Sequence, residues 1–114
     1  MATSVDRARG ILELIDLIQH HLDGVDQETF TRDVHMRDAT GLRLIAIGET
    51  TRAIDPSIKD RYPAIEWSKI TAMRNFIAHN YDGISGATLW ETVRHHLPAL
   101  AITCRTIIGE AEER

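Results

Sequence analysis

The sequence contains one cysteine, Cys104, so a disulfide within the chain is impossible and the disulfide-rich secreted classes are excluded. A lone thiol fits a reducing cytoplasm. Aromatic residues make up only 5% of the 114 residues, so aliphatic side chains must fill most of any core. The three prolines and seven glycines are few for a sandwich of short strands, and this scarcity favours helices.

Long apolar runs are also missing. No stretch approaches the roughly 18 apolar residues that a membrane helix needs, so no membrane association is expected. Residues 1–6 do not resemble the start of a signal peptide, because Glu13 and Asp16 interrupt the apolar residues that follow them. We therefore expect a cytoplasmic protein.

An excess of basic residues is missing as well. The formal net charge is −4, whereas a general nucleic-acid binder usually carries a basic face. Any contact with RNA would therefore have to be local, through a few arginines focused in a cleft.

The spacing of apolar residues predicts an all-α protein. They recur at helical intervals over residues 4–22, 32–54, 66–79 and 85–109, and a short helix is expected over residues 26–30. Four main helices joined by short connections predict an antiparallel four-helix bundle with a short extra helix. The length of the chain fits a single domain that takes in all of it, 1–114.

Capping and helix-breaking residues set the expected boundaries. Ser4 is expected to cap the first helix, and Asp26 the short one. Residues 56–63 are expected to form a polar loop. Pro98 lies inside the apolar pattern of the last helix, so a kink or a break is predicted there.

The helix expected over residues 32–54 carries a candidate supporting residue. Its predicted buried stripe consists of Leu42, Ile45, Ala46 and Ala53. Glu49 follows Ile45 by four residues and so shares this face, from which it is expected to hold Arg74 or a polar group of a neighbouring helix. Gly48 costs helix stability, so its presence predicts close helix packing.

The most informative segment begins at Arg74. This arginine shares a helix face with Ile70 and Ile77, so it needs a partner or an opening onto a cleft. His79 follows five residues later, which on a regular helix is a rotation of about 140°. The two side chains would converge only if the helix loosened before the turn predicted over residues 80–86, a turn in which asparagine tolerates a left-handed backbone.

An arginine and a histidine together suffice for cleavage of a phosphodiester without a metal or cofactor. Histidine moves protons near neutral pH, and arginine holds phosphate oxygens in a bidentate fork. Other roles stay open at this point. Arg74 is equally explained by an ion pair with Glu49, His79 by capping of the helix carboxyl end, and Tyr81 by packing.

Two histidine pairs, His20-His21 and His95-His96, raise the question of a metal. Adjacent residues on a helix point about 100° apart, so neither pair is suited to chelate one ion. No metal site is predicted.

The segment Arg74-x-x-x-x-His79-x-Tyr81 resembles the signature of HepT-like proteins of the HEPN superfamily. The similarity extends over residues 4–108. It includes Ile47-Gly48-Glu49, Tyr62-Pro63, Trp67, Met73-Arg74-Asn75, Leu89-Trp90-Glu91-Thr92-Val93 and Leu97-Pro98. One position departs from the pattern, since Asn80 stands where glycine is expected.

The resemblance implies a helical bundle that forms a homodimer, with an RNA-cleaving cleft built from the arginine and histidine of both subunits. By position, Arg74 and His79 are the catalytic residues here, with Glu49 and Asn75 in support. It also implies an MntA-like minimal nucleotidyltransferase as antitoxin, which transfers AMP from ATP onto Tyr81.

The sequence therefore predicts the toxin of a type VII toxin–antitoxin pair. Its expected activity is that of a metal-independent endoribonuclease acting on cellular RNA, with tRNA among the candidate substrates and no action on DNA. The alternative is a helical adaptor that binds and regulates a nucleotidyltransferase without cutting RNA, which the net negative charge favours.

Overall fold

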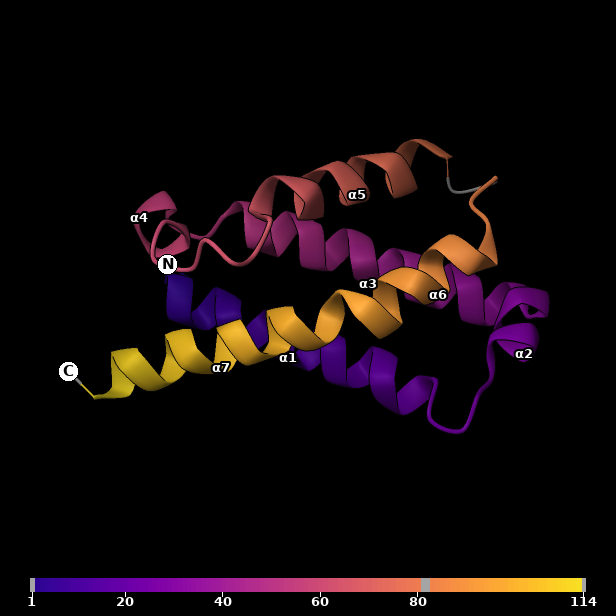
Figure 1. Ribbon diagram of the computed structural model, residues 1–114, viewed down its shortest axis with the longest axis horizontal. Coiled ribbons are helices and arrows are strands. Elements are labelled where there is room, and N and C mark those ends of the chain that lie inside the picture. Colours follow the sequence, from indigo (N-terminus) through magenta and orange to yellow (C-terminus); the bar gives the residue numbers. More distant parts are fainter. Residues whose placement is uncertain (1, 81–82, 114) are drawn as a thin grey trace.

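The computed structural model describes residues 2–80 and 83–113, and the regular structure in these ranges is helical (Figure 1). In chain order the helices are α1 (Ser4–His21), α2 (Gln27–Arg32), α3 (Val34–Arg52), α4 (Pro56–Lys59), α5 (Trp67–Asn80), α6 (Gly86–His95) and α7 (Leu97–Glu112). Among the described residues, no helix combines the length and the apolar character needed to cross a membrane.

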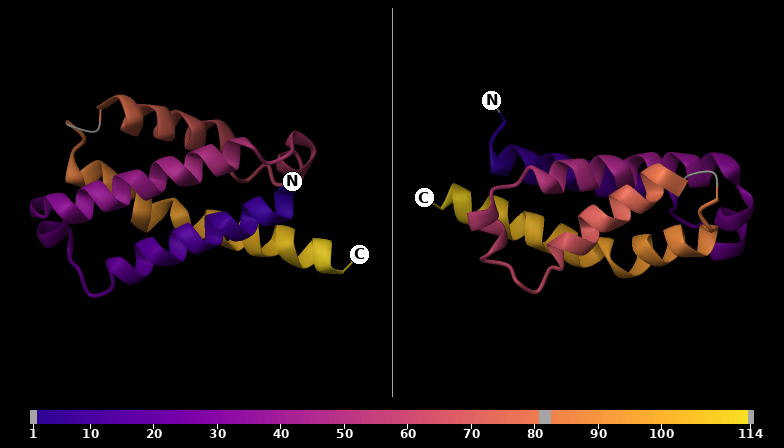
Figure 2. Two further views of the ribbon diagram at one scale, coloured as in Figure 1. Left: turned by 180° about the vertical axis from the view of Figure 1, so that it is seen from behind. Right: turned by 90° about the horizontal axis from the view of Figure 1, so that it is seen from above.

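The helices form the predicted antiparallel bundle. α1 packs against both α3 and α7, and α5 lies along α3 on the side away from α1 (Figures 1 and 2). α6 continues the line of α7 and packs on the short helix α2. The four main elements are thus α1, α3, α5 and the pair α6–α7, and α2 is the extra helix.

The core between these helices is almost entirely aliphatic, as the scarcity of aromatic residues requires. Phe30 is its one fully buried aromatic residue in the described part of the chain, and its ring centroid lies 5.3 Å from that of Trp90. The other fully buried large apolar side chains are Ile11, Ile15, Ile18, Leu22, Leu44, Ile47, Ile54 and Cys104.

The start of α6 is pressed against α2. A Cβ atom on Gly86 would lie 2.9 Å from the Cα atom of Thr31, a distance that real Cβ atoms do not tolerate. Glycine is therefore required at this position for α6 to begin beside α2. Ser85 caps α6 by accepting a hydrogen bond from the backbone of Thr88 at 3.1 Å.

Two boundary predictions were wrong at the amino-terminal half. Thr3, and not Ser4, caps α1, because Thr3 and Asp6 form a reciprocal capping box. Ser4 instead accepts a hydrogen bond from the backbone N–H of Asp55 at 3.1 Å. The expected loop over 56–63 begins with the helical turn α4, which Asp55 caps and whose first position Pro56 suits.

The break predicted at Pro98 is confirmed. α6 ends at His95 and α7 begins at Leu97, with Pro98 in its first turn, where a missing N–H costs nothing. The last helix runs beyond the predicted end at 109. Its charged end is held by ion pairs of Arg9 with Glu112, at 2.9 Å, and of Arg61 with Glu110.

The predicted buried stripe of α3 was wrong. Leu42 is 69% exposed, and Ala53 is exposed as well. Two long helices, α1 and α5, pack along α3, and α2 and α6 also contact it, so its buried face is broad. This face consists of Thr40, Gly41, Leu44, Ile47, Gly48 and Thr51. The apolar residues chosen from the sequence lie at the edge of this face or outside it.

Candidate active site

The site is built on the contact between α3 and α5. A Cβ atom on Gly48 would lie 2.3 Å from the Cβ atom of Arg74 and 2.8 Å from its Cγ atom. It would also lie 3.5 Å from the carbonyl oxygen of Ile70. The close helix packing predicted from Gly48 is therefore confirmed, and the stem of Arg74 occupies the space that any larger residue at 48 would fill.

This packing fixes the guanidinium of Arg74 between two neighbours. Its Nε atom lies 2.5 Å from Glu49 Oε1, and its Nη1 atom donates a hydrogen bond to Asn75 Oδ1 at 3.1 Å. Nε is buried, and its contact with the Glu49 carboxylate is an ion pair. The side chain of Arg74 remains 29% exposed.

Glu49 forms an ion pair with Arg74, which was one of the alternatives that the sequence left open for Arg74. It was also predicted to lie on a buried stripe, and this was wrong, because its side chain is 48% exposed. The contact between Glu49 and Arg74 follows from Gly48, because the absence of a side chain at 48 brings Arg74 close to α3, next to the Glu49 carboxylate. Solvent reaches the Glu49 carboxylate and screens the ion pair from that side, which lowers the free energy that holds the pair together.

His79 lies apart from Arg74 on a different side of α5. The loosening of the helix that would let the two side chains converge does not occur, because α5 is a continuous α-helix through Asn80. The rotation of about 140° between Arg74 and His79 therefore persists, with an axial separation of about 7.5 Å. His79 is exposed in the last turn, where a cation favours the helix dipole.

The expected left-handed backbone at Asn80 is likewise absent. No described residue other than glycine has a positive φ, and Asn80 is the last residue of α5. Its Nδ2 atom donates to the carbonyl oxygen of Phe76 at 3.0 Å, so it closes the helix end with its side chain. Tyr81, the predicted acceptor of AMP, lies outside the described residues.

Other reactive side chains do not offer an alternative centre. Burial raises the pKa of the Cys104 thiol to about 12, so Cys104 is not a thiolate nucleophile at neutral pH. His95 lies 3.6 Å from Glu91 on the same helix. Within residues 2–80 and 83–113, no three histidine, cysteine, aspartate or glutamate side chains are grouped to hold a metal ion.

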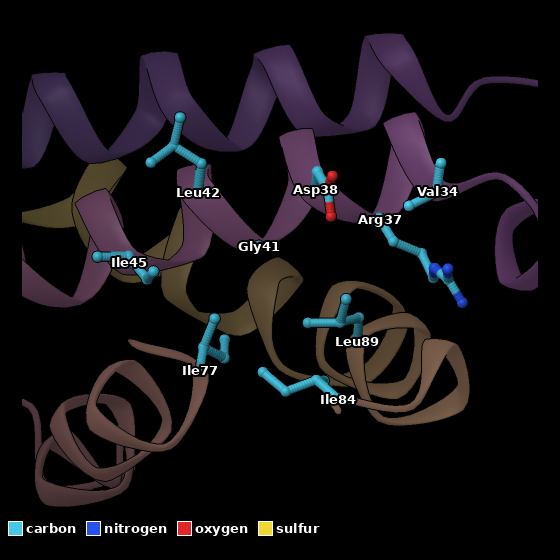
Figure 3. Close-up of a pocket in the computed structure, with 9 residues that line it drawn as sticks. All are labelled: Val34, Arg37, Asp38, Gly41, Leu42, Ile45, Ile77, Ile84 and Leu89. Atoms are coloured by element: carbon cyan, nitrogen blue, oxygen red, sulfur yellow. The ribbon is translucent and has the colours of Figure 1, made fainter. Parts of the chain in front are cut away.

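A groove of about 530 Å³ opens where α3, α5 and α6 meet (Figure 3). We call it the α3–α5–α6 groove. Its lining residues are Val34, Arg37, Asp38, Gly41, Leu42, Ile45, Ile77, Ile84 and Leu89. Sequence analysis did not predict this groove. The available signal was the spacing of Arg37 and Gly41, since residues four apart share a helix face and glycine leaves that face hollow.

Comparison with known proteins adds a family to this geometry. The family model described as ribonuclease HepT-like matches residues 11–107. The chain belongs to this family. The resemblance seen in the sequence is thereby confirmed, and Arg74 and His79 lie within the matched part of this HepT-like chain.

Relatives of this HepT-like chain are similar along most of their length. A protein of Methanocaldococcus jannaschii, named provisionally as an RNase, is 30% identical over 104 residues, which are 91% of this chain and 90% of the relative. A Thermococcus cleftensis protein, named provisionally as ribonuclease HepT, is 32% identical over 95 residues, or 83% and 86% of the two chains. No solved structure matches.

The contact at Gly48 predicts a loss of stability in Gly48→Ala. Alanine normally stabilises a helix interior by about 0.5–1 kcal/mol relative to glycine. At position 48 this gain is outweighed by overlap with Arg74, and overpacking typically costs about 1–3 kcal/mol. Urea unfolding followed by circular dichroism measures the difference.

Gly10→Ala is the matched control, because Gly10 is also inside a helix and a Cβ atom there meets nothing within 4 Å. Gly10→Ala should be more stable than the wild type, and Gly48→Ala less stable. Equal stabilisation of the two variants would contradict the tight contact between α3 and α5.

Proposed function

We propose that this HepT-like ribonuclease is a metal-independent endoribonuclease in which Arg74 holds the scissile phosphate and His79 moves the proton. The observation that carries the proposal is the guanidinium of Arg74, which Glu49 and Asn75 hold at the contact of α3 with α5 while its side chain stays 29% exposed. A phosphate oxygen is the acceptor that an arginine at such a position binds best.

The surroundings of Arg74 support this role. Glu49 and Asn75 keep the guanidinium in place without RNA, and the Glu49 carboxylate is exposed enough to move aside when phosphate arrives. A chain of net charge −4 needs positive charge concentrated at one place in order to bind RNA. Glu49 and Asn75 hold the positive charge of Arg74 at such a place.

The reaction transfers the phosphoryl group within the RNA. His79 accepts the proton of a ribose 2′-hydroxyl, and the 2′-oxygen attacks the adjacent phosphorus. The bond from phosphorus to the 5′-oxygen of the next nucleotide breaks, that oxygen takes a proton from water, and His79 returns the proton it accepted to the solvent. The products are a 2′,3′-cyclic phosphate and a 5′-hydroxyl, and Arg74 stabilises the charge on the phosphoryl oxygens.

The divergence of Arg74 and His79 on one helix supports a homodimer. Because α5 is regular, one copy does not direct both side chains to the same phosphate. A second copy that places its His79 opposite Arg74 completes the site, and by two-fold symmetry creates a second one. Phe76, one turn before His79 and 52% exposed, provides apolar surface for such an interface.

Replacement of His79 tests the proposed chemistry. His79→Ala should lower RNA cleavage in EDTA by at least about a hundredfold, the usual contribution of a general acid–base group. Arg74→Ala should cause a loss of similar size. Cleavage is followed by gel electrophoresis of total RNA, and circular dichroism checks that each variant is folded.

His20→Ala and Arg105→Ala are matched controls, since both residues are exposed and neither lies on α3 or α5. Both controls should cut RNA at the wild-type rate. The mechanism is wrong if folded His79→Ala protein cuts as fast as the wild type.

We further propose that the ribonuclease is the toxin of a cytoplasmic toxin–antitoxin pair, acting on cellular RNA such as tRNA. Its antitoxin is an MntA-like nucleotidyltransferase that transfers AMP to Tyr81. Tyr81 follows His79 by two residues in the sequence. Each AMP adds a negative charge and a bulky nucleoside, so it would exclude RNA by repulsion and by volume.

Tyr81→Phe should cut RNA but escape silencing by the nucleotidyltransferase and ATP. Tyr62→Phe is the matched control, because the chain has two tyrosines, and it should still be silenced. Mass spectrometry should find the added AMP on Tyr81 in the wild type. AMP on another residue, or silencing of Tyr81→Phe by AMP transfer, would refute the assignment.

The net charge of −4 favours one competing function, an adaptor that regulates a nucleotidyltransferase without cutting RNA. Expressing the protein without its partner distinguishes the two functions. A ribonuclease toxin degrades cellular RNA under this condition, whereas an adaptor leaves it intact.

A further inference from the structure

The α3–α5–α6 groove lies next to the proposed cleavage site along the same helices. Ile77 contributes to its wall from α5, between Arg74 and His79 in the sequence. On α3, Asp38, Leu42, Ile45 and Glu49 follow one another at intervals of three or four residues, so they share one side of the helix. Ile45, which lines the groove, is thus one helical turn from Glu49, the partner of Arg74.

The far end of the groove carries a positive charge at Arg37. Its Nη1 atom donates to the carbonyl oxygen of Thr31 at 2.9 Å, which fixes the position of the guanidinium. Among the described residues Arg37 takes part in no ion pair, unlike Arg9, Arg32 and Arg61, each of which pairs with a glutamate. Arg37 is thus a held cation whose charge no carboxylate neutralises directly.

Arg37 lies well away from the ion pair of Glu49 and Arg74 along α3. Arg37 and Glu49 are twelve residues apart on α3, which corresponds to about 18 Å along the helix axis. Between them the walls are mainly aliphatic, with Ile45, Ile77, Ile84 and Leu89 around the hollow in Figure 3. Such a hollow, with a few charged groups at its rim, is typical of a small-ligand or nucleotide site.

We propose that this groove binds one nucleotide of the RNA substrate, a few nucleotides from the cleaved bond. The base lies on the aliphatic walls, and its phosphate pairs with Arg37. Asp38, also at the rim, accepts a hydrogen bond from the base and disfavours a second phosphate there. The inference rests on the proposed ribonuclease function, and Arg37 acts in it as a binding residue and not as a catalytic one.

The test measures RNA binding separately from cleavage. A fluorescein-labelled oligonucleotide of ten adenosines is titrated with full-length His79→Ala protein, which should bind without cutting, and anisotropy gives the Kd at several salt concentrations. Adding Arg37→Gln should weaken binding about tenfold, the size of a lost charge-assisted hydrogen bond. It should also lower the slope of log Kd against log salt by about 0.7.

Arg32→Gln, also made in the His79→Ala protein, is the matched control. It removes the same charge from α2, outside the groove, and should change the Kd less than twofold. Arg37→Lys should keep the salt slope of the parent, because it retains the charge. Thermal unfolding checks that loss of the hydrogen bond to Thr31 has not unfolded the protein.

Three results would overturn the proposal. The first is an equal effect of Arg37→Gln and Arg32→Gln, which would show general electrostatics. The second is an unchanged Kd in folded Arg37→Gln protein. The third is loss of a dimer, seen by light scattering, in both Arg37→Gln and Ile45→Trp, which would assign the groove to a second copy.

Failure of the proposed function gives a different result. Wild-type protein that cuts no RNA but binds the oligonucleotide in an Arg37-dependent way would refute the ribonuclease mechanism and leave the groove as a nucleotide site. Wild-type protein that cuts RNA, with binding independent of Arg37, would refute the groove alone.

Discussion

The contact of Gly48 with Arg74 is the constraint on which the rest of the candidate site depends. With no side chain at 48, α5 lies close enough to α3 for the stem of Arg74 to fill the gap. The guanidinium then meets Glu49 beside the glycine and Asn75 beside itself. Its side chain remains 29% exposed, and the Glu49 carboxylate 48%, so the guanidinium is held in place and still open to solvent.

The regularity of α5 is the second constraint. A continuous helix through Asn80 separates the directions of Arg74 and His79, so a single copy carries the two groups without joining them. Proton transfer and charge stabilisation at one phosphate both require the catalytic group to lie within about 3 Å of the reacting atoms. The homodimer proposed above would satisfy this requirement by placing His79 of one copy opposite Arg74 of the other.

The sequence was sufficient for the features that depend on spacing and backbone chemistry. Helical periodicity predicted the bundle, Pro98 predicted the break between α6 and α7, and Gly48 predicted close packing. It was insufficient for α3, which packs against α1 on one side and α5 on the other, and for this reason Leu42 was expected to be buried and is exposed. Asn80 was placed in a turn because its hydrogen bond to the Phe76 carbonyl is not visible in a sequence. The role of Tyr81 stays a prediction.

The central claim is that one cleavage site combines Arg74 of one copy with His79 of another. Arg74→Ala and His79→Ala proteins, each inactive alone, are co-expressed with different tags, and the mixed dimer is isolated and assayed on RNA. Each mixed dimer should hold one intact site of two, so the isolated mixed dimer should regain about half of the wild-type rate. Folded mixed dimers that cut no faster than either variant alone would contradict the shared site.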